Sequence, residues 1–120
     1  TLVKLKNSNI KIGICTNKKQ YLTEKILKSF EIDNYFDVVV GSSEMIPLKP
    51  SSKMLELCLN KLESKPENSL MIGDSDKDII PANELGIFSV FVEYGYGKLH
   101  KIKPSLKIKN INDLFKYIKI

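Results

Sequence analysis

The stretch that decides the fold class of this chain is Ser69-Leu70-Met71-Ile72-Gly73-Asp74-Ser75-Asp76-Lys77-Asp78. It begins as a short apolar run, which predicts a buried strand, and it changes at Gly73 into a cluster of carboxylates. A helix is predicted directly afterwards, over residues 76–85, with Gly86 as the residue that closes it. A strand that leads straight into a helix is the repeating unit of a parallel α/β sheet.

The same alternation of apolar runs and helical periods extends in both directions from this stretch. The predicted strands cover residues 11–15, 37–41, 69–73, 87–92 and 106–108. The predicted helices cover residues 20–30, a segment for which Pro50 is the expected starting position, residues 76–85, and residues 111–118 with Asn110 or Asn112 as the cap. In the first of these helices, Ile26, Leu27 and Phe30 are expected on one face. The predicted fold class is α/β.

Composition excludes several classes of function. With 120 residues, 42% of them hydrophobic and 28% charged, the chain has the size and composition of one globular domain with one core. The net charge of +5 comes from lysines alone; no arginine is present, and the lysines are scattered. A protein that binds nucleic acid would be expected to use arginine for bidentate contacts. The sequence also lacks the run of about 18 apolar residues that a membrane-spanning helix needs. We therefore expect neither nucleic acid nor a membrane as a partner.

The two cysteines, Cys15 and Cys58, do not have the spacing of a zinc site. Cys15 lies in an apolar run and Cys58 in a predicted helix, so we expect buried thiols in a reducing compartment. The first residues, Thr1 to Lys6, lack the apolar centre of a signal peptide. The expected location is the cytoplasm.

Polar residues follow three of the predicted strands. Thr16-Asn17-Lys18 follows the first, Leu48-Lys49-Pro50 comes after the second, and the Asp74–Asp78 cluster follows the third. Parallel strands present their carboxyl ends at one edge of the sheet, where ligands bind. A hydroxyl with backbone N–H groups can hold phosphate oxygens, an ammonium can offset transition-state charge, and carboxylates can hold Mg²⁺. The order of these groups predicts a site for phosphoryl chemistry.

Each of these residues also has an ordinary structural interpretation. Thr16 taken alone is more typical of a turn or a helix cap, and Lys49 is one of 19 lysines. Asp74 and Asp78 suit turn and cap positions equally well. It is their joint appearance, in order, after three successive strands that favours a site.

The three segments resemble the second, third and fourth motifs of haloacid dehalogenase-type phosphatases, and the likeness covers essentially the whole chain. Within that superfamily, Thr16-Asn17-Lys18, Tyr35-Phe36-Asp37 and Glu93-Tyr94-Gly95-Tyr96-Gly97 are most similar to phosphoglycolate phosphatases. The resemblance implies a Rossmann-like parallel sheet with helices on both faces. It also implies Mg²⁺ as the cofactor and a small phosphorylated metabolite as the substrate.

The same resemblance assigns roles to five residues. Thr16 would bind the phosphoryl group through its hydroxyl, and Asn17 through its backbone N–H. Lys49 would bridge the phosphate and the nucleophilic carboxylate, and Asp74 would ligate Mg²⁺. Asp78, one helical turn beyond Asp74, would orient Lys49 or the metal ligands from behind.

Two features depart from the family pattern. Ser52 stands where a second proline is frequent, and no Asp-x-Asp follows a strand upstream of Thr16, although the first aspartate of that motif forms the aspartyl-phosphate. We therefore expect residues 1–120 to be the C-terminal part of the core domain, with Thr1 to Asn9 ending the helix that follows the cap domain. The central strand, between the strands ending at Thr16 and Gly73, and the cap would be missing. The expected partner is that N-terminal strand and cap of the same protein, without which this chain alone is expected to be inactive.

Other functions stay open beside the phosphomonoester hydrolase. A phosphomutase resembling β-phosphoglucomutase uses the same core, and a non-catalytic phosphate- or metal-binding module is a further alternative. A dehalogenase is disfavoured because it does not need the acidic cluster around Asp74. His100 is expected to be a surface histidine, whereas Tyr94 and Tyr96 are expected either to shape the substrate rim or to pack in a turn.

Overall fold

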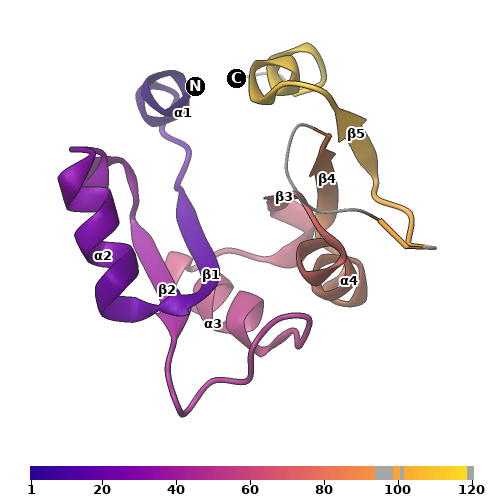
Figure 1. The fold of residues 1–120 in the computed structure, drawn as a ribbon. Helices are drawn as coiled ribbons and strands as arrows, with labels where there is room; N and C mark the ends of the chain where they lie inside the picture. Colours follow the sequence, from indigo (N-terminus) through magenta and orange to yellow (C-terminus); the bar gives the residue numbers. More distant parts are fainter. Residues whose placement is uncertain (94–98, 101, 119–120) are drawn as a thin grey trace.

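The computed structural model describes residues 1–93, 99–100 and 102–118, so the predicted positions of Tyr94 and Tyr96 lie outside the described residues. The strands are β1 (Gly13–Lys19), β2 (Val38–Ser42), β3 (Leu70–Gly73), β4 (Phe88–Val92) and β5 (Leu106–Ile108). The helices are α1 (Leu2–Asn7), α2 (Gln20–Ser29), α3 (Lys53–Leu62) and α4 (Asp76–Leu85), with the 3-10 turns η1 (Asp33–Tyr35), η2 (Pro66–Asn68) and η3 (Ile111–Lys116). The α/β fold class is confirmed (Figure 1).

The strands form two parallel sheets rather than one. β1 pairs with β2, and β4 pairs with both β3 and β5. Within the described residues no sheet pairing joins β1 to β3, and the two halves stand apart in Figure 1. The interruption lies between the strands that end near Thr16 and at Gly73, where the sequence predicted that a central strand is missing.

Helices α3 and α4 hold the two halves together through a shared apolar core. Leu55 of α3 packs with Ala82 of α4 and with Ile87. Cys15 of β1 and Met71 of β3 pack against this same cluster, one from each sheet. Because these side chains are removed from water jointly, burial of this cluster fixes the relative position of the two sheets.

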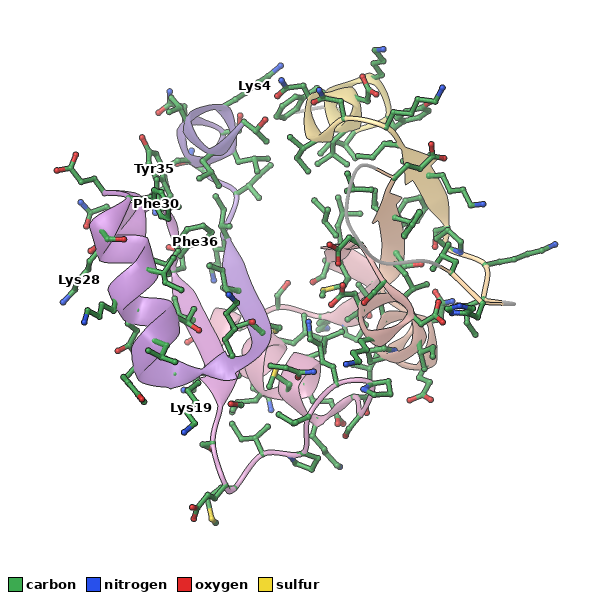
Figure 2. The ribbon with its side chains drawn as sticks, viewed as in Figure 1. Lys4, Lys19, Lys28, Phe30, Tyr35 and Phe36 are labelled. Carbon is green, nitrogen blue, oxygen red and sulfur yellow. The ribbon has the colours of Figure 1, made fainter. Side chains whose placement is uncertain are left out.

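A second connection joins the halves at the opposite end of the strands. The ammonium of Lys4 in α1 lies 4.2 Å from the centroid of the Phe115 ring in η3 (Figure 2). The side chains of Thr1 and Asn112 are hydrogen-bonded in the same place. The first and last helical segments of the described chain therefore lie side by side, above the interruption in the sheet (Figure 1).

Three local predictions are corrected by the structure. Pro50 does not begin a helix, because the Lys49–Pro50 peptide bond is cis and α3 begins at Lys53 with Ser52 as its cap. The last helix is not an α-helix but a six-residue 3-10 segment, with Asn110 rather than Asn112 as the cap. Of the three residues expected on one face of α2, only Leu27 is buried: Ile26 is exposed, and Phe30 is 71% exposed because α2 ends at Ser29, just before it.

Candidate functional site

Thr16, Asn17, Lys49, Asp74 and Asp78 all lie near the carboxyl ends of β1 and β3, at an edge that we call the carboxyl rim. Thr16 and Asn17 directly follow Cys15, within an irregular part of β1 where the register with β2 shifts. Lys49 is in the loop that leads from β2 to α3, Asp74 follows β3, and Asp78 is in the first turn of α4. The sequence predicted that Thr16 and Asn17 follow the first strand; they lie within β1, whereas Lys49 and Asp74 lie in loops and Asp78 lies in α4.

Lys49 occupies the centre of the carboxyl rim. Its Nζ lies 2.5 Å from Oδ1 of Asp78 and donates a hydrogen bond of 2.9 Å to the carbonyl oxygen of Cys15. The side chains of Lys49 and Asp78 are 9% and 10% exposed, so the ion pair is largely withdrawn from water. A positive charge held this way sits between β1 and α4, across the interruption in the sheet.

The side-chain amide of Asn17 fixes the backbone of Lys49. Asn17 Oδ1 accepts a hydrogen bond from the Lys49 backbone N–H at 2.9 Å, and Asn17 Nδ2 donates one to the Lys49 carbonyl at 3.2 Å. Sequence reasoning gave Asn17 only a backbone role and missed this contact. The signal was weak: an amide has the donor and acceptor of a peptide group, but nothing in the sequence says which loop it pairs with.

Thr16 has a local contact that matches its turn interpretation. Its Oγ1 accepts a hydrogen bond from the backbone N–H of Lys18 at 3.2 Å, and the residue is half-buried. The hydroxyl proton is not used by that bond, because the oxygen acts there as the acceptor. Thr16 can therefore hold the turn and still donate to a phosphate oxygen.

Asp78 connects Lys49 to the loop that carries Asp74. While Oδ1 of Asp78 faces Lys49, its Oδ2 accepts a hydrogen bond of 3.1 Å from the Asp74 backbone N–H. Gly73 makes this approach possible, because a Cβ there would lie 2.2 Å from the Cβ of Asp78. Glycine at this position therefore gives steric room to the Asp78 side chain.

The carboxylates of the acidic cluster have different surroundings. Asp76 accepts hydrogen bonds from the backbone N–H of His100 at 3.0 Å and faces His100 Nδ1 at 2.9 Å, and these contacts hold the pKa of the Asp76 carboxyl below its usual range. His100 is a surface histidine, with 76% of its side chain exposed, but this partner was not foreseen. Asp76 and Asp78 are therefore already engaged, whereas Asp74 is exposed at the rim.

The chemistry of Asp74 suits Mg²⁺. This ion is commonly bound by one or two carboxylates and completes its octahedron with water and substrate phosphate. The exposed carboxylate of Asp74 can supply one such oxygen ligand. Among the described residues no group of three or more His, Cys, Asp or Glu side chains could form an all-protein cage.

Comparison with known proteins agrees with this arrangement. The sequence profile of the haloacid dehalogenase-like hydrolases matches residues 1–92. A putative pyrophosphatase PpaX from Caldanaerobacter subterraneus is 38% identical over 98% of this chain and 55% of its own length. A phosphoglycolate phosphatase from Aquifex aeolicus is 33% identical over 97% of this chain and 54% of its own length. The chain thus spans about half the length of these curated relatives.

Solved structures share the fold. A predicted phosphoglycolate phosphatase from Haemophilus somnus superposes with a TM-score of 0.87 at 29% identity, over 96% of this chain and 52% of that one. A β-phosphoglucomutase from Clostridium difficile gives a TM-score of 0.81 at 27% identity, over 97% and 50% of the two chains. The fold and these likenesses together define a Rossmann-like α/β protein. The chain belongs to the haloacid dehalogenase-like hydrolase family.

Within the described residues, no helix has the length and apolar character needed to cross a bilayer.

Proposed function

We propose that this chain is the phosphate- and metal-binding part of an Mg²⁺-dependent phosphomonoester hydrolase that acts on a small phosphorylated metabolite in the cytoplasm. The observation that carries the proposal is the ammonium of Lys49, held at the rim by Asp78 and by the Cys15 carbonyl while its side chain is 9% exposed. A lysine needed only for solubility would leave its charge in water. A withdrawn, oriented charge suits the stabilisation of a transferring phosphoryl group.

The chain's own residues have separate tasks in this reaction. Lys49 offsets the charge that develops on the phosphoryl oxygens, and it needs little rearrangement because Asp78 and Asn17 already orient it. The Thr16 hydroxyl and the Asn17 backbone N–H donate to the same oxygens. Asp74 would hold Mg²⁺, which supplies Lewis-acid polarisation of the phosphate when bound. The carboxylate that would form the aspartyl-phosphate is not one of these rim residues.

The names of curated relatives support the proposed substrate class. The names of the two curated relatives point to pyrophosphate and phosphoglycolate, both small and multiply charged anions. A phosphomutase is the second candidate, because the β-phosphoglucomutase structure shares the fold. The fold alone does not separate transfer to water from transfer to a sugar hydroxyl.

The experiment assays the polypeptide that contains residues 1–120, with any further segments it has, on three substrates. These are 2-phosphoglycolate, pyrophosphate and β-glucose 1-phosphate. Release of inorganic phosphate from either of the first two, abolished by EDTA and restored by Mg²⁺, is expected. Conversion of β-glucose 1-phosphate to glucose 6-phosphate without phosphate release would replace the hydrolase with the mutase. Binding of phosphate without turnover of any of the three would favour the non-catalytic module.

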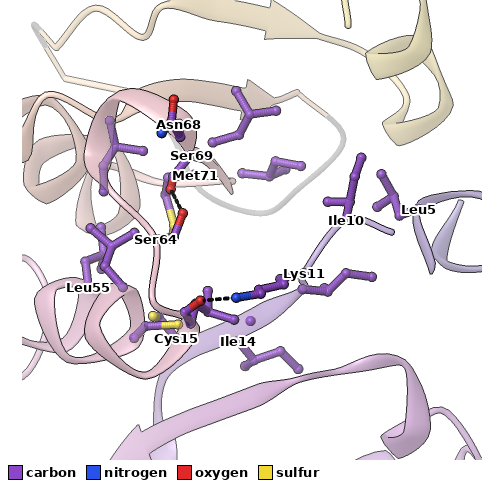
Figure 3. A pocket seen from close by; sticks show the side chains of 18 of the residues that line it. Leu5, Ile10, Lys11, Ile14, Cys15, Leu55, Ser64, Asn68, Ser69 and Met71 are labelled. Carbon is purple, nitrogen blue, oxygen red and sulfur yellow. Dashed lines mark hydrogen bonds between the residues drawn. The ribbon is translucent and has the colours of Figure 1, made fainter. Parts of the chain in front are cut away.

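We further propose that the interruption between β1 and β3 receives one extended strand of the same protein. A cavity of about 780 Å³ lies there, which we call the groove, and it is lined largely by apolar side chains such as Ile10, Ile14, Leu55 and Met71 (Figure 3). Both backbone groups of Ile12 are bonded to Asp37 on the β2 side. Since strand residues alternate, the backbone of Gly13 and Cys15 is directed to the groove side.

The width of the groove suits a single strand. A chain of contacts joins the Cys15 carbonyl oxygen to Lys49 Nζ, then to the Asp78 carboxylate, and then to the Asp74 amide nitrogen. The distance between the Cys15 oxygen and the Asp74 nitrogen is therefore at most about 11 Å. Two strands with one strand between them are about 9.5–10 Å apart, whereas directly paired strands are about 4.8 Å apart. The relatives are almost twice as long as the part they share with this chain, so they carry enough additional sequence to supply it.

Complementation tests this second proposal. The part of the Caldanaerobacter relative outside its matched region would be co-expressed, as a separate chain, with residues 1–120. Co-purification, slower amide exchange at Gly13 and Cys15, and gain of phosphatase activity are expected, while residues 1–120 alone turn over no p-nitrophenyl phosphate. Unchanged exchange at Gly13 and Cys15 in a complex that does form would contradict insertion in the groove without touching the assignment of the carboxyl rim.

A further inference from the structure

The two cysteines of the chain belong to one apolar cluster, although they are 43 positions apart and lie in different elements. Cys15 of β1 packs against the cluster formed by Val40, Met54 and Cys58. Its Sγ is 3.7 Å from the carbonyl oxygen of Met54, one turn before Cys58 on the same side of α3. Both thiols are free, with Cys58 buried and Cys15 half-buried.

The absence of a side chain at Gly13 lets the Cys58 sulfur lie close to β1. Gly13 and Cys15 are two positions apart in β1, so they face α3 together. A Cβ at Gly13 would lie 2.7 Å from the Cys58 sulfur, so no larger residue fits beside that thiol. Both cysteines line the groove, and Cys15 is labelled there in Figure 3.

The pKa values of the two thiols shift in opposite directions. The polar interaction with Cys15 is the main cause that lowers the pKa of Cys58, while burial opposes the shift and Lys61 assists it. The same contact, together with burial, raises the pKa of Cys15. Cys58 is therefore the more acidic of the two thiols and the better nucleophile.

We propose that Cys15 and Cys58 form an oxidisable dithiol, which a hydroperoxide converts to an intramolecular disulfide between β1 and α3. In the first step the Cys58 thiolate attacks the peroxide oxygen, the O–O bond breaks, and a sulfenic acid and one hydroxide or alkoxide result. In the second step the Cys15 sulfur attacks the Cys58 sulfur, gives up its proton, and displaces hydroxide, which leaves as water. Two thiols are oxidised to one disulfide, and the peroxide is reduced.

This modification would act on the residue that holds Lys49. Cys15 contributes its carbonyl oxygen to the Lys49 ammonium and its side chain to the contact with Cys58. A disulfide would tie this residue covalently to α3, directly beside the carboxyl rim. The inference does not depend on the proposed hydrolase activity, because it concerns only the two thiols and the groove.

The experiment treats the folded protein with hydrogen peroxide, blocks remaining thiols with N-ethylmaleimide, and maps the products by mass spectrometry without reduction. Loss of both alkylatable thiols, loss of two hydrogen masses, and a cross-linked peptide pair containing Cys15 and Cys58 are expected. In Cys15→Ala, dimedone should trap a sulfenic acid on Cys58; in Cys58→Ala, Cys15 should keep its thiol under the same treatment. Circular dichroism checks that each variant is folded, and the result for the parent protein does not depend on them. Two alkylated cysteines after peroxide treatment, or a disulfide only between molecules, would overturn the proposal.

Discussion

At the scale of single residues, the withdrawn ion pair between Lys49 and Asp78 is the feature with the largest energetic consequence. Both side chains are about one tenth exposed, so water could not solvate either charge if its partner were removed. A buried pair adds little net stability when intact, but removal of one partner leaves an uncompensated charge. Asp78 has the further task of accepting the Asp74 N–H, so its loss affects two loops.

The first prediction follows from this asymmetry. Asp78→Ala should lower the free energy of unfolding by about 3–5 kcal/mol, the cost of isolating a buried charge. Asp78→Asn should cost less, because its amide oxygen can still accept from the Asp74 N–H. Urea unfolding monitored by circular dichroism measures both. The matched control is Glu56→Ala, which breaks an exposed pair with Lys53 at 3.7 Å and should cost less than about 1 kcal/mol. Equal losses for Asp78→Ala and Glu56→Ala would contradict the burial argument.

Asp74 and Asp76 provide a second test, because they are neighbours with different surroundings. Asp74→Asn should weaken Mg²⁺ activation and be partly rescued by a higher Mg²⁺ concentration, since a neutral amide is a poorer ligand for a hard cation. Asp76→Asn serves as the control, because its carboxylate faces His100. Phosphatase rates across a Mg²⁺ titration distinguish the two. If Asp76→Asn shifted the Mg²⁺ dependence and Asp74→Asn did not, the metal ligand would be misassigned.

At the scale of elements, the pairing of β1 with β2 begins at Asp37. Its carboxylate Oδ2 accepts a hydrogen bond from the Ile12 N–H at 2.8 Å, and its backbone N–H donates to the Ile12 carbonyl at 2.7 Å. The bond from Ile12 is the main cause that holds the pKa of Asp37 below its usual range, and Lys6 contributes as well. The sequence placed Asp37 at the start of a predicted strand and in a family likeness, but its bonds to Ile12 were not predicted.

The third prediction uses this lowered pKa. A carboxyl with a depressed pKa in the folded state stabilises the fold above its unfolded value near 3.8, and that contribution is lost as the pH falls through the folded value. In Asp37→Asn the titration disappears, while the amide oxygen can still accept from Ile12. The unfolding midpoint in urea should therefore fall less steeply below about pH 4 in the variant than in the parent. Parallel curves for the two proteins from pH 6 to pH 2.5 would contradict this role for Asp37.

Elements that depend on local pattern were predictable, and those that depend on long-range contacts were not. Apolar runs predicted all five strands, and Gly86 was identified as the end of α4, where its φ is +77°. The cis bond before Pro50 was missed, because a proline before a helical pattern is equally compatible with a helix start. The contact of Asn17 with Lys49 was missed for a related reason, since it joins an irregular part of β1 to a loop 32 positions away.

At the scale of the whole molecule, the two sheets are connected at three levels. Helices α3 and α4 share a core, α1 touches η3 at one end, and Lys49 spans the rim at the other. The groove lies between these connections, and its walls carry an unpaired strand edge from each sheet. Such edges are aggregation-prone unless they are covered, which is the physical reason to expect that a strand fills the groove.

The central claim is that the withdrawn ammonium of Lys49 stabilises the transferring phosphoryl group. The most direct test compares the variants Lys49→Ala and Lys53→Ala in steady-state hydrolysis of p-nitrophenyl phosphate. Both variants are made in the active polypeptide that contains residues 1–120. Lys53 is four residues away and its side chain is 66% exposed. Lys49→Ala should lower kcat by roughly 10²–10³ with no rescue by Mg²⁺, whereas Lys53→Ala should stay within about twofold of the parent. A folded Lys49→Ala protein as fast as the parent at every Mg²⁺ concentration would contradict the account.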